Sequence, residues 1–155
     1  MSVFHSRADQ KLDSKGRVSV PALFRSVLGG AREDGLMLSQ PLLGTRCIEV
    51  APAAMLQKRY EEVARLNRHN PIGAQLRHVR LSSIAMVGFD KEGRIVLPSH
   101  LIAYAGLEAL VTFVGLGDVF QIWDPKALAT YDEEAWAVAQ EHQELLHVPL
   151  TEPAG

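Results

Sequence analysis

An internal repeat restricts the possible folds of this chain more than any other feature of its sequence. Residues 13–21 read Asp-Ser-Lys-Gly-Arg-Val-Ser-Val-Pro, and residues 90–98 read Asp-Lys-Glu-Gly-Arg-Ile-Val-Leu-Pro, 77 positions further on. Both copies match Asp-x-x-Gly-Arg-apolar-x-apolar-Pro. A repeat predicts that one structural unit is used twice. Because 155 residues lie within the range of one domain, we expect the two units to share a core.

Each copy of the motif predicts a turn. Aspartate can accept backbone hydrogen bonds two residues further on, and glycine supplies the positive φ that such turns often need. The structural turn residues are therefore Asp13 and Gly16 in the first copy and Asp90 and Gly93 in the second.

A short strand and a short helix should follow each turn. Alternating apolar residues predict strands at 18–20 and 95–97, and the proline after each strand should end it. The next residues predict helices at 22–28 and 99–105, each closed by a glycine.

Each repeat should continue into a hairpin and then a longer helix. The segment before the first turn, 3–12, is expected to form a strand that pairs within the first repeat. The predicted hairpins are 36–39 with 47–50 and 109–114 with 119–123, and the later elements are helices at 53–66, 72–81 and 126–146 and a strand at 84–89.

Apolar stripes on the two longer helices predict packing against a neighbour. The stripes comprise Leu56, Tyr60, Val63 and Leu66 in the first helix and Ala135, Trp136, Ala139, His142 and Leu146 in the second. The fold class is α+β, mainly β. We divide the chain into a first repeat (7–54), a helical linker (55–82), a second repeat (83–128) and a C-terminal helix and tail (129–155), with 149–155 disordered or loosely docked.

Composition excludes several classes of protein. The sequence has no apolar run near the ~18 residues of a membrane span and no signal peptide pattern. Its single cysteine, Cys47, lies in an apolar strand, so we expect a core thiol, no disulfide and a reducing cytoplasm. Six scattered histidines predict no metal site, and we find no catalytic set and expect no cofactor.

Charge is segregated along the chain. Residues 1–32 carry six Lys or Arg against two Asp, and residues 108–152 carry nine acids against one Lys. This asymmetry predicts a basic face for an anionic partner. Cations on rigid turns suit phosphate contact, and arginine can also read guanine. Alternatively, Arg17 and Arg94 are internal and pair with Asp13 and Asp90, and both roles stay open.

The motifs resemble those of the MraZ family, whose chains carry two SpoVT-AbrB-type units. The resemblance rests on 12–22 with Phe24 and Arg25, on 90–98 with 105–107, and on Ile122 and Trp123. It implies a cytoplasmic, nucleoid-associated transcriptional regulator that binds repeated double-stranded DNA sites in the promoter of the division and cell-wall gene cluster. It also implies a pseudo-two-fold, swapped-hairpin β-barrel and ring-shaped homo-oligomers.

Lys15 and Arg17 match the DNA-contacting signature of that family by position. The candidate DNA-binding residues are Lys15, Arg17, Arg7, Lys11, Arg25, Lys91 and Arg94. The first turn is expected to dominate, because Glu92 stands inside the second. An AbrB-like antitoxin or a nucleoid scaffold protein is the alternative, and an enzyme comes third.

Overall fold

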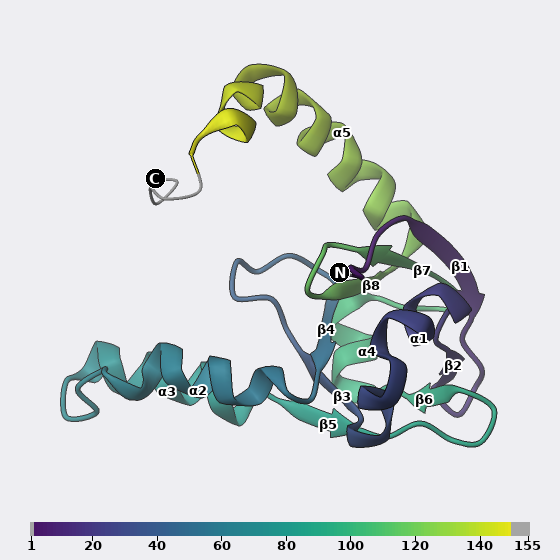
Figure 1. Cartoon of the computed structure of the whole chain (residues 1–155), viewed down its shortest axis with the longest axis horizontal. Coiled ribbons are helices and arrows are strands. Elements are labelled where there is room, and N and C mark those ends of the chain that lie inside the picture. Colours follow the sequence, from purple (N-terminus) through teal and green to yellow (C-terminus); the bar gives the residue numbers. More distant parts are fainter. Residues whose placement is uncertain (1, 150–155) are drawn as a thin grey trace. The chain divides into compact units, whose positions relative to one another are not determined.

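Antiparallel strands form the centre of the fold in a computed structural model, which describes residues 2–149 (Figure 1). The chain divides into two units, 1–124 and 125–155. The predicted tail, 149–155, lies outside the described residues except for Pro149.

The first unit contains a six-stranded sheet and a separate two-stranded ribbon. The sheet has the order β1-β7-β8-β4-β3-β5, and the ribbon pairs β2 with β6. The strands are β1 (Arg7–Lys11), β2 (Arg17–Ser19), β3 (Leu36–Ser39), β4 (Ile48–Pro52), β5 (Ala85–Val87), β6 (Arg94–Val96), β7 (Leu110–Gly115) and β8 (Phe120–Trp123). All pairs are antiparallel. The mixed α and β class and the two predicted hairpins, β3–β4 and β7–β8, are therefore confirmed.

The expected closed barrel is wrong for the described residues. The edge strands β1 and β5 do not pair with each other, and β2 and β6 form a separate ribbon that has an isolated bridge to the neighbouring part of the chain, from Val18 to Leu12. The ribbon is short because Pro21 and Pro98 follow its strands, and proline cannot donate the next ladder hydrogen bond.

The expected partner of the first strand is also wrong. β1 pairs with β7 of the second repeat, from Arg7 opposite Val114 to Lys11 opposite Leu110. Phe4, three residues before β1, pairs with the same hairpin, because the amides of Phe4 and Gly117 each donate to the carbonyl of the other. Partner choice follows burial here, because Phe4 packs edge-on against Phe24 and Phe120 in the core.

Helices follow the strands much as their end signals predict. The helices α1 (Ala22–Leu28) and α4 (Ser99–Ala105) have the predicted bounds, and Gly29 and Gly106 follow them with φ of 53° and 63°. A 3₁₀ helix, η1 (Gly29–Asp34), continues α1. The linker forms α2 (Met55–Ala64) and α3 (Pro71–Ser82), with Asn70 capping α3 by accepting from the amide of Ile72 at 2.9 Å.

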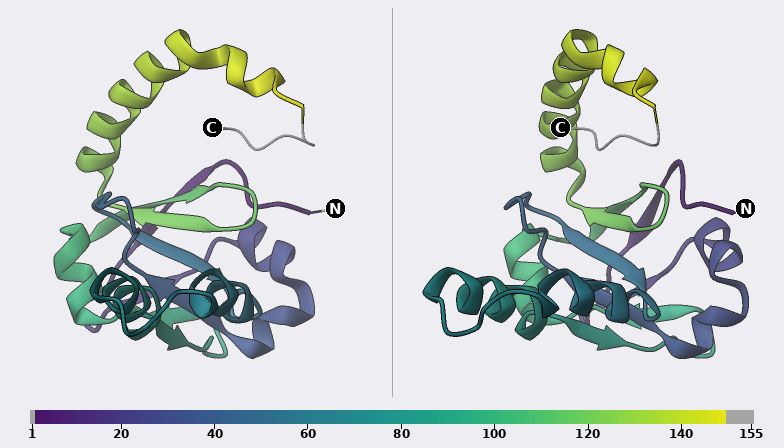
Figure 2. Two further views of the ribbon diagram at one scale, coloured as in Figure 1. Left: turned by 90° about the vertical axis from the view of Figure 1, so that its left-hand side faces the viewer. Right: turned by 60° about the vertical axis from the view of Figure 1, so that its left-hand side comes forward.

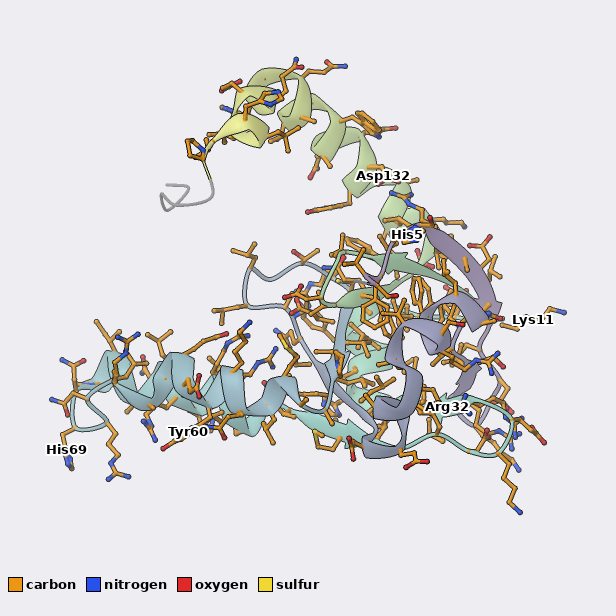
Figure 3. The ribbon with its side chains drawn as sticks, in the orientation of Figure 1. His5, Lys11, Arg32, Tyr60, His69 and Asp132 are labelled. Atoms are coloured by element: carbon orange, nitrogen blue, oxygen red, sulfur yellow. The ribbon has the colours of Figure 1, made fainter. Side chains whose placement is uncertain are left out.

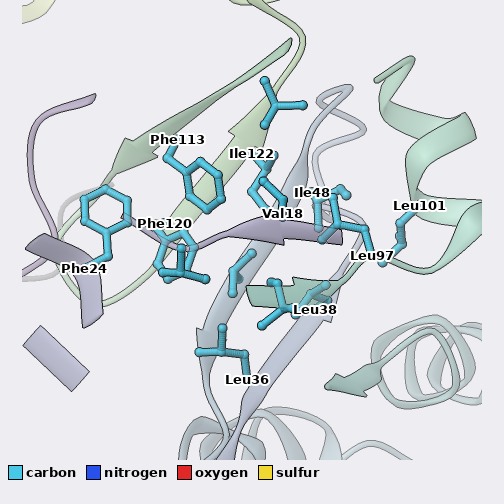
Figure 4. Packing of buried hydrophobic residues seen from close by; sticks show 14 of the residues in the cluster. Val18, Phe24, Leu36, Leu38, Ile48, Leu97, Leu101, Phe113, Phe120 and Ile122 are labelled. Carbon is cyan, nitrogen blue, oxygen red and sulfur yellow. The ribbon is translucent and has the colours of Figure 1, made fainter. Parts of the chain in front are cut away.

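The core draws on both repeats, as expected from the length of the chain. Val18, Phe24 and Leu38 from the first repeat lie with Leu97 and Phe113 from the second in one buried cluster (Figure 4). Alternate residues of a strand point to opposite faces, and on the strands that contribute to this cluster the inward-pointing residues are apolar.

The predicted stripe on α2 is only partly buried. Val63 is buried, but Leu56 and Tyr60 are exposed. The neighbour of α2 is α3, which lies beside it as the second arm of a helical hairpin (Figures 1 and 2). The helix was expected to begin at residue 53, but β4 continues to Pro52 and the helix begins at Met55.

The second unit contains α5 (Pro125–His142) and a 3₁₀ turn, η2 (Gln143–His147). Its apolar stripe was expected to be packed, and this is wrong: Trp136 is 69% exposed and Leu146 is 82% exposed. The periodicity was present, but the described side chains of this stripe are exposed.

Candidate nucleic-acid interface

The first turn is held by one carboxylate. Asp13 Oδ1 accepts from the backbone amides of Lys15 at 3.0 Å and Arg17 at 2.8 Å, and Oδ2 accepts from Arg17 Nε at 2.7 Å. The backbone closes the same turn, because the Gly16 amide donates to the Asp13 carbonyl at 3.0 Å. Gly16 has a φ of +79°, a conformation that a side chain strongly disfavours.

The second turn repeats this geometry. Asp90 Oδ1 accepts from the amides of Glu92 at 2.8 Å and Arg94 at 2.9 Å, and Oδ2 accepts from Arg94 Nε at 2.8 Å. Gly93 has a φ of +77°. Each Asp therefore pairs with its Arg in both copies, and both arginine side chains remain partly exposed.

Hydrogen bonding to the charged form keeps both aspartates ionised. The Arg17 amide is the largest cause that lowers the pKa of Asp13, and the Arg94 amide has the same effect on the pKa of Asp90. Each carboxylate thus fixes the backbone of its turn and the position of one guanidinium.

The ribbon brings the two arginines to one face. Arg17 lies opposite Val96, and Ser19 lies opposite Arg94, so these four residues share the outer face while Val18 and Ile95 point into the core. Since the strands are antiparallel, the turns lie at opposite ends of the ribbon. The face is a two-stranded surface with one guanidinium near each end.

Backbone bonds between the repeats make this surface rigid. The Leu97 amide donates to the Gly16 carbonyl at 2.8 Å, and the Val20 amide donates to the Gly93 carbonyl at 3.1 Å. Each turn is thereby tied to the far end of the partner strand.

The two arginines differ in their acidic neighbours. Arg94 pairs with Asp90 and also, through Nη2, with Glu92 at 2.8 Å. These contacts raise the pKa of Arg94, with the bond to Asp90 as the largest cause. Among the described residues, Arg17 has its ion pair with one carboxylate, that of Asp13, where Arg94 has two.

Arg25 lies at the second turn, although its sequence position is in the first repeat. Its Nε donates to the Val20 carbonyl at 3.0 Å, and a Cβ on Gly93 would come within 2.9 Å of its Nη1. Ile102, at the corresponding position of the second repeat, lies instead near Gly16. Sequence reasoning missed this exchange, which the 77-residue offset between Arg25 and Ile102 could have indicated.

The remaining candidate cations are exposed but more dispersed. Lys15 and Lys91 lie in the two turns. Arg7 and Lys11 lie at the ends of β1, an edge strand of the larger sheet, and Figure 3 shows Lys11 directed outward. The structure therefore brings Arg17, Arg94 and Arg25 together around the ribbon. Lys11 lies next to the ribbon, because the following residue, Leu12, forms a bridge to Val18, whereas Arg7 is at the far end of β1.

A buried cation was not predicted from the sequence. Arg59 of α2 is 5% exposed and donates from Nη1 to Ser39 Oγ at 2.9 Å, while its Nη2 lies 3.9 Å from Glu49. Burial is the largest cause that lowers its pKa. The sequence pattern of α2 could not predict the burial of Arg59, because its partners Ser39 and Glu49 lie on β3 and β4.

Other kinds of site are not indicated in the described residues. No group of three or more His, Cys, Asp or Glu side chains within 2–149 is arranged to hold a metal ion. Of the helices described, none combines the length and the apolar character that a membrane crossing requires.

The described chain is thus a mixed α and β protein with an open antiparallel sheet and two Asp-x-x-Gly-Arg turns on one ribbon. A family model described as "MraZ protein, putative antitoxin-like" matches residues 84–147. The protein named Transcriptional regulator MraZ from Rickettsia bellii (strain OSU 85-389) is 33% identical over 142 residues, which cover 91% of this chain and 94% of that protein. Its namesake from Rickettsia rickettsii (strain Sheila Smith) is 34% identical over 141 residues, with the same shares covered. The chain belongs to the MraZ family.

Proposed function

We propose that this protein is a transcriptional regulator that binds double-stranded DNA through the outer face of the β2–β6 ribbon. The observation that carries the proposal is the placing of Arg17 and Arg94 on one rigid face, each oriented by its own aspartate. A two-stranded ribbon fits the major groove, where guanidinium groups can reach guanine.

The candidate residues divide by role. Arg17 reads bases or binds phosphate directly, since it pairs with one carboxylate where Arg94 pairs with two. Lys15 and Lys91 bind phosphate from the turns, and Arg7 and Lys11 add contacts along β1. Arg25 and Arg94 support the second turn and add positive charge there.

The proposal extends to the arrangement of the repeats. We take 7–54 and 83–128 as two units with exchanged hairpins related by a pseudo-two-fold axis, separated by the linker 55–82 and followed by 129–155. The pairing of β1 with β7, and of its counterpart β5 with β3, supports this reading. Several copies in a ring would engage repeated sites together and gain by effective concentration.

The names of the relatives support a role in transcription. Proteins named as transcriptional regulators resemble this chain along most of its length. We propose that it acts in the cytoplasm on nucleoid DNA, at repeated sites in the promoter of the division and cell-wall gene cluster.

Binding to pooled genomic fragments at about 50 and 200 mM salt tests the proposal. The expected result is enrichment of that promoter and a steep fall in affinity at the higher salt. Equal binding to all fragments would reduce the function to that of a nucleoid scaffold, and no binding at the lower salt would refute it.

An antitoxin-like role is the second candidate, and the wording of the matching family model favours it. Such a protein would neutralise a partner protein as well as bind DNA. Co-purification of a stoichiometric protein partner whose toxicity this chain relieves would support that role over regulation alone.

A further inference from the structure

We propose that the groove between the α2–α3 hairpin and the loop after β3 binds the phosphate group of a small molecule, held by Arg59 and Arg80. This site lies outside the proposed DNA interface and is a function beyond the proposed one. Three features support it: a concave surface, a buried guanidinium in its lining, and the distribution of charge around that guanidinium.

The groove has the size of a small-ligand site. Its volume is ≈ 300 Å³, at the lower end of the range for ligand pockets in proteins. The loop after β3, helix α2 and the last turns of α3 line it, and all three belong to the first unit of the chain. Pro41, Leu42 and Val79 supply an apolar wall, and the rest of the lining is polar or charged.

Arg59 is the feature of this groove that an ordinary solvated surface does not explain. It is 5% exposed, and charged side chains are rarely buried so deeply unless they are well paired. Its Nη1 donates to Ser39 Oγ at 2.9 Å, but its Nη2 lies 3.9 Å from Glu49, beyond hydrogen-bond distance. Since a guanidinium can donate five hydrogen bonds, this buried cation has the capacity to bind an anion.

Arg80 brings a second guanidinium to the same groove. It pairs through Nε with Glu62 at 2.9 Å, which orients its side chain. Burial lowers the pKa of Arg59, and the positive charge of Arg80 lowers that pKa further, while Glu49 and Glu62 raise it. An anion between the two guanidinium groups offsets their repulsion, and the planar fork of arginine matches the oxygens of a phosphate.

The acids near these two arginines line a different hollow. That second hollow, of ≈ 190 Å³, is also lined by Arg59 and Arg80, and its lining includes Glu49, Glu62 and Asp118. In the described chain, no Asp or Glu lines the groove itself. The carboxylates therefore anchor the two cations from the second hollow, and the groove presents the same cations to an anion.

A phosphate group suits this lining better than a single carboxylate does. A phosphate monoester carries close to two negative charges at neutral pH and three strong acceptor oxygens. It can therefore contact both guanidinium groups and also accept from the imidazole of His78, which lines the groove. The apolar wall leaves a surface for a small organic body attached to the phosphate.

The burial of Arg59 favours a small molecule over the DNA backbone. The phosphates of a duplex are joined to sugars on both sides and lie on a convex surface, so they do not enter a narrow groove to reach a side chain that is 5% exposed. The residues that line the groove are also separate from those of the β2–β6 ribbon and its two turns.

Isothermal titration calorimetry of the full chain, in a buffer free of phosphate and sulfate, tests the site. The probes are inorganic phosphate, glycerol phosphate, succinate as a carboxylate, and glycerol as an organic body without an anion. We expect saturable binding of glycerol phosphate, at least about tenfold weaker binding of succinate, and no binding of glycerol. Tighter binding of glycerol phosphate than of inorganic phosphate supports an organic phosphate as the ligand, and equal affinities support free phosphate.

Two variants of the groove and one matched control assign the residues. Arg59→Met replaces the buried cation by an apolar side chain of similar length, and Arg80→Gln removes the second cation in case the first variant does not fold. Each should weaken glycerol phosphate binding by about tenfold or more, because hydrogen bonds to charged groups contribute about that factor. Arg65→Gln removes an exposed cation just after α2 and outside the groove, so it should bind as the wild type does.

Three results would overturn the site. They are no saturable binding of either phosphate, binding of succinate as tight as that of glycerol phosphate, and equal weakening by Arg80→Gln and Arg65→Gln. DNA binding is scored separately: Arg59→Met should bind the enriched promoter as the wild type does. Loss of DNA binding in a well-folded Arg59→Met would make the groove part of the DNA interface and overturn the small-molecule site. Absence of DNA binding by the wild type would refute the regulator, while calorimetry would still decide the groove.

Discussion

Asp13 and Asp90 each use one carboxylate to hold a turn and a guanidinium together. Because the pKa of both groups is lowered from the ordinary value of 3.8, the folded protein binds fewer protons there than the unfolded chain. Their stabilisation is present above the unfolded pKa and is lost as pH falls through the lower folded pKa.

The double variant Asp13→Asn, Asp90→Asn should therefore be less stable at neutral pH and should lose less stability on acidification below about pH 5. Urea unfolding at a series of pH values measures this, with Asp34→Asn, an exposed site outside both turns, as the control. A variant with the same pH profile as the wild type would contradict the role of these carboxylates.

Cys47 should behave as a core thiol. It is buried, and burial is the main cause that raises its pKa to about 12, with Glu49 contributing. At pH 8 a thiol reagent should react slowly with the native protein and rapidly in denaturant. Equal rates in both conditions would show that the β4 strand opens readily.

At the scale of elements, the two turns depend on backbone conformations that glycine alone adopts easily. Gly16→Ala should destabilise the protein by about 1–2 kcal/mol, because a side chain is strained at positive φ. The new Cβ would also lie 3.1 Å from the Leu97 carbonyl oxygen. Gly30→Ala is the control, since its φ is not positive and nothing lies within 4 Å of the added Cβ. Equal unfolding free energies for the two variants would contradict this account.

Local signals predicted the elements well. Proline after each strand and glycine after each short helix are chemical constraints that act within a few residues, so α1 and α4 have the predicted bounds. The Asp-Arg pairs were also foreseen, because both partners lie in one turn.

Partners across the fold could not be predicted in the same way. The alternation of exposed and half-buried residues in β1 indicates a strand but not which strand lies beside it, and burial of Phe4 against the second repeat decides the pairing. The position of Arg25 over Gly93 likewise depends on the exchange between repeats. The stripe on α5 was recognised, but periodicity alone does not show whether a neighbour is present.

At the scale of the whole molecule, neither repeat should fold alone. The strands β1, β2 and β4 of the first half all pair with strands of the second half. A fragment of residues 1–82 would lose these partners and expose the shared core, so it should be largely unfolded. Dispersed NMR signals from a monomeric fragment would contradict this.

The most direct test of the proposed interface compares the DNA affinity of three variants on the enriched promoter. Arg17→Ala should weaken binding by roughly 1–3 kcal/mol per copy engaged, with little change in melting temperature. Arg94→Ala should affect melting more than binding, because two carboxylates already hold its side chain. Arg68→Ala, an exposed cation in the loop between α2 and α3, should bind as the wild type does. Normal binding by Arg17→Ala, with binding lost in a well-folded Arg94→Ala, would contradict the account.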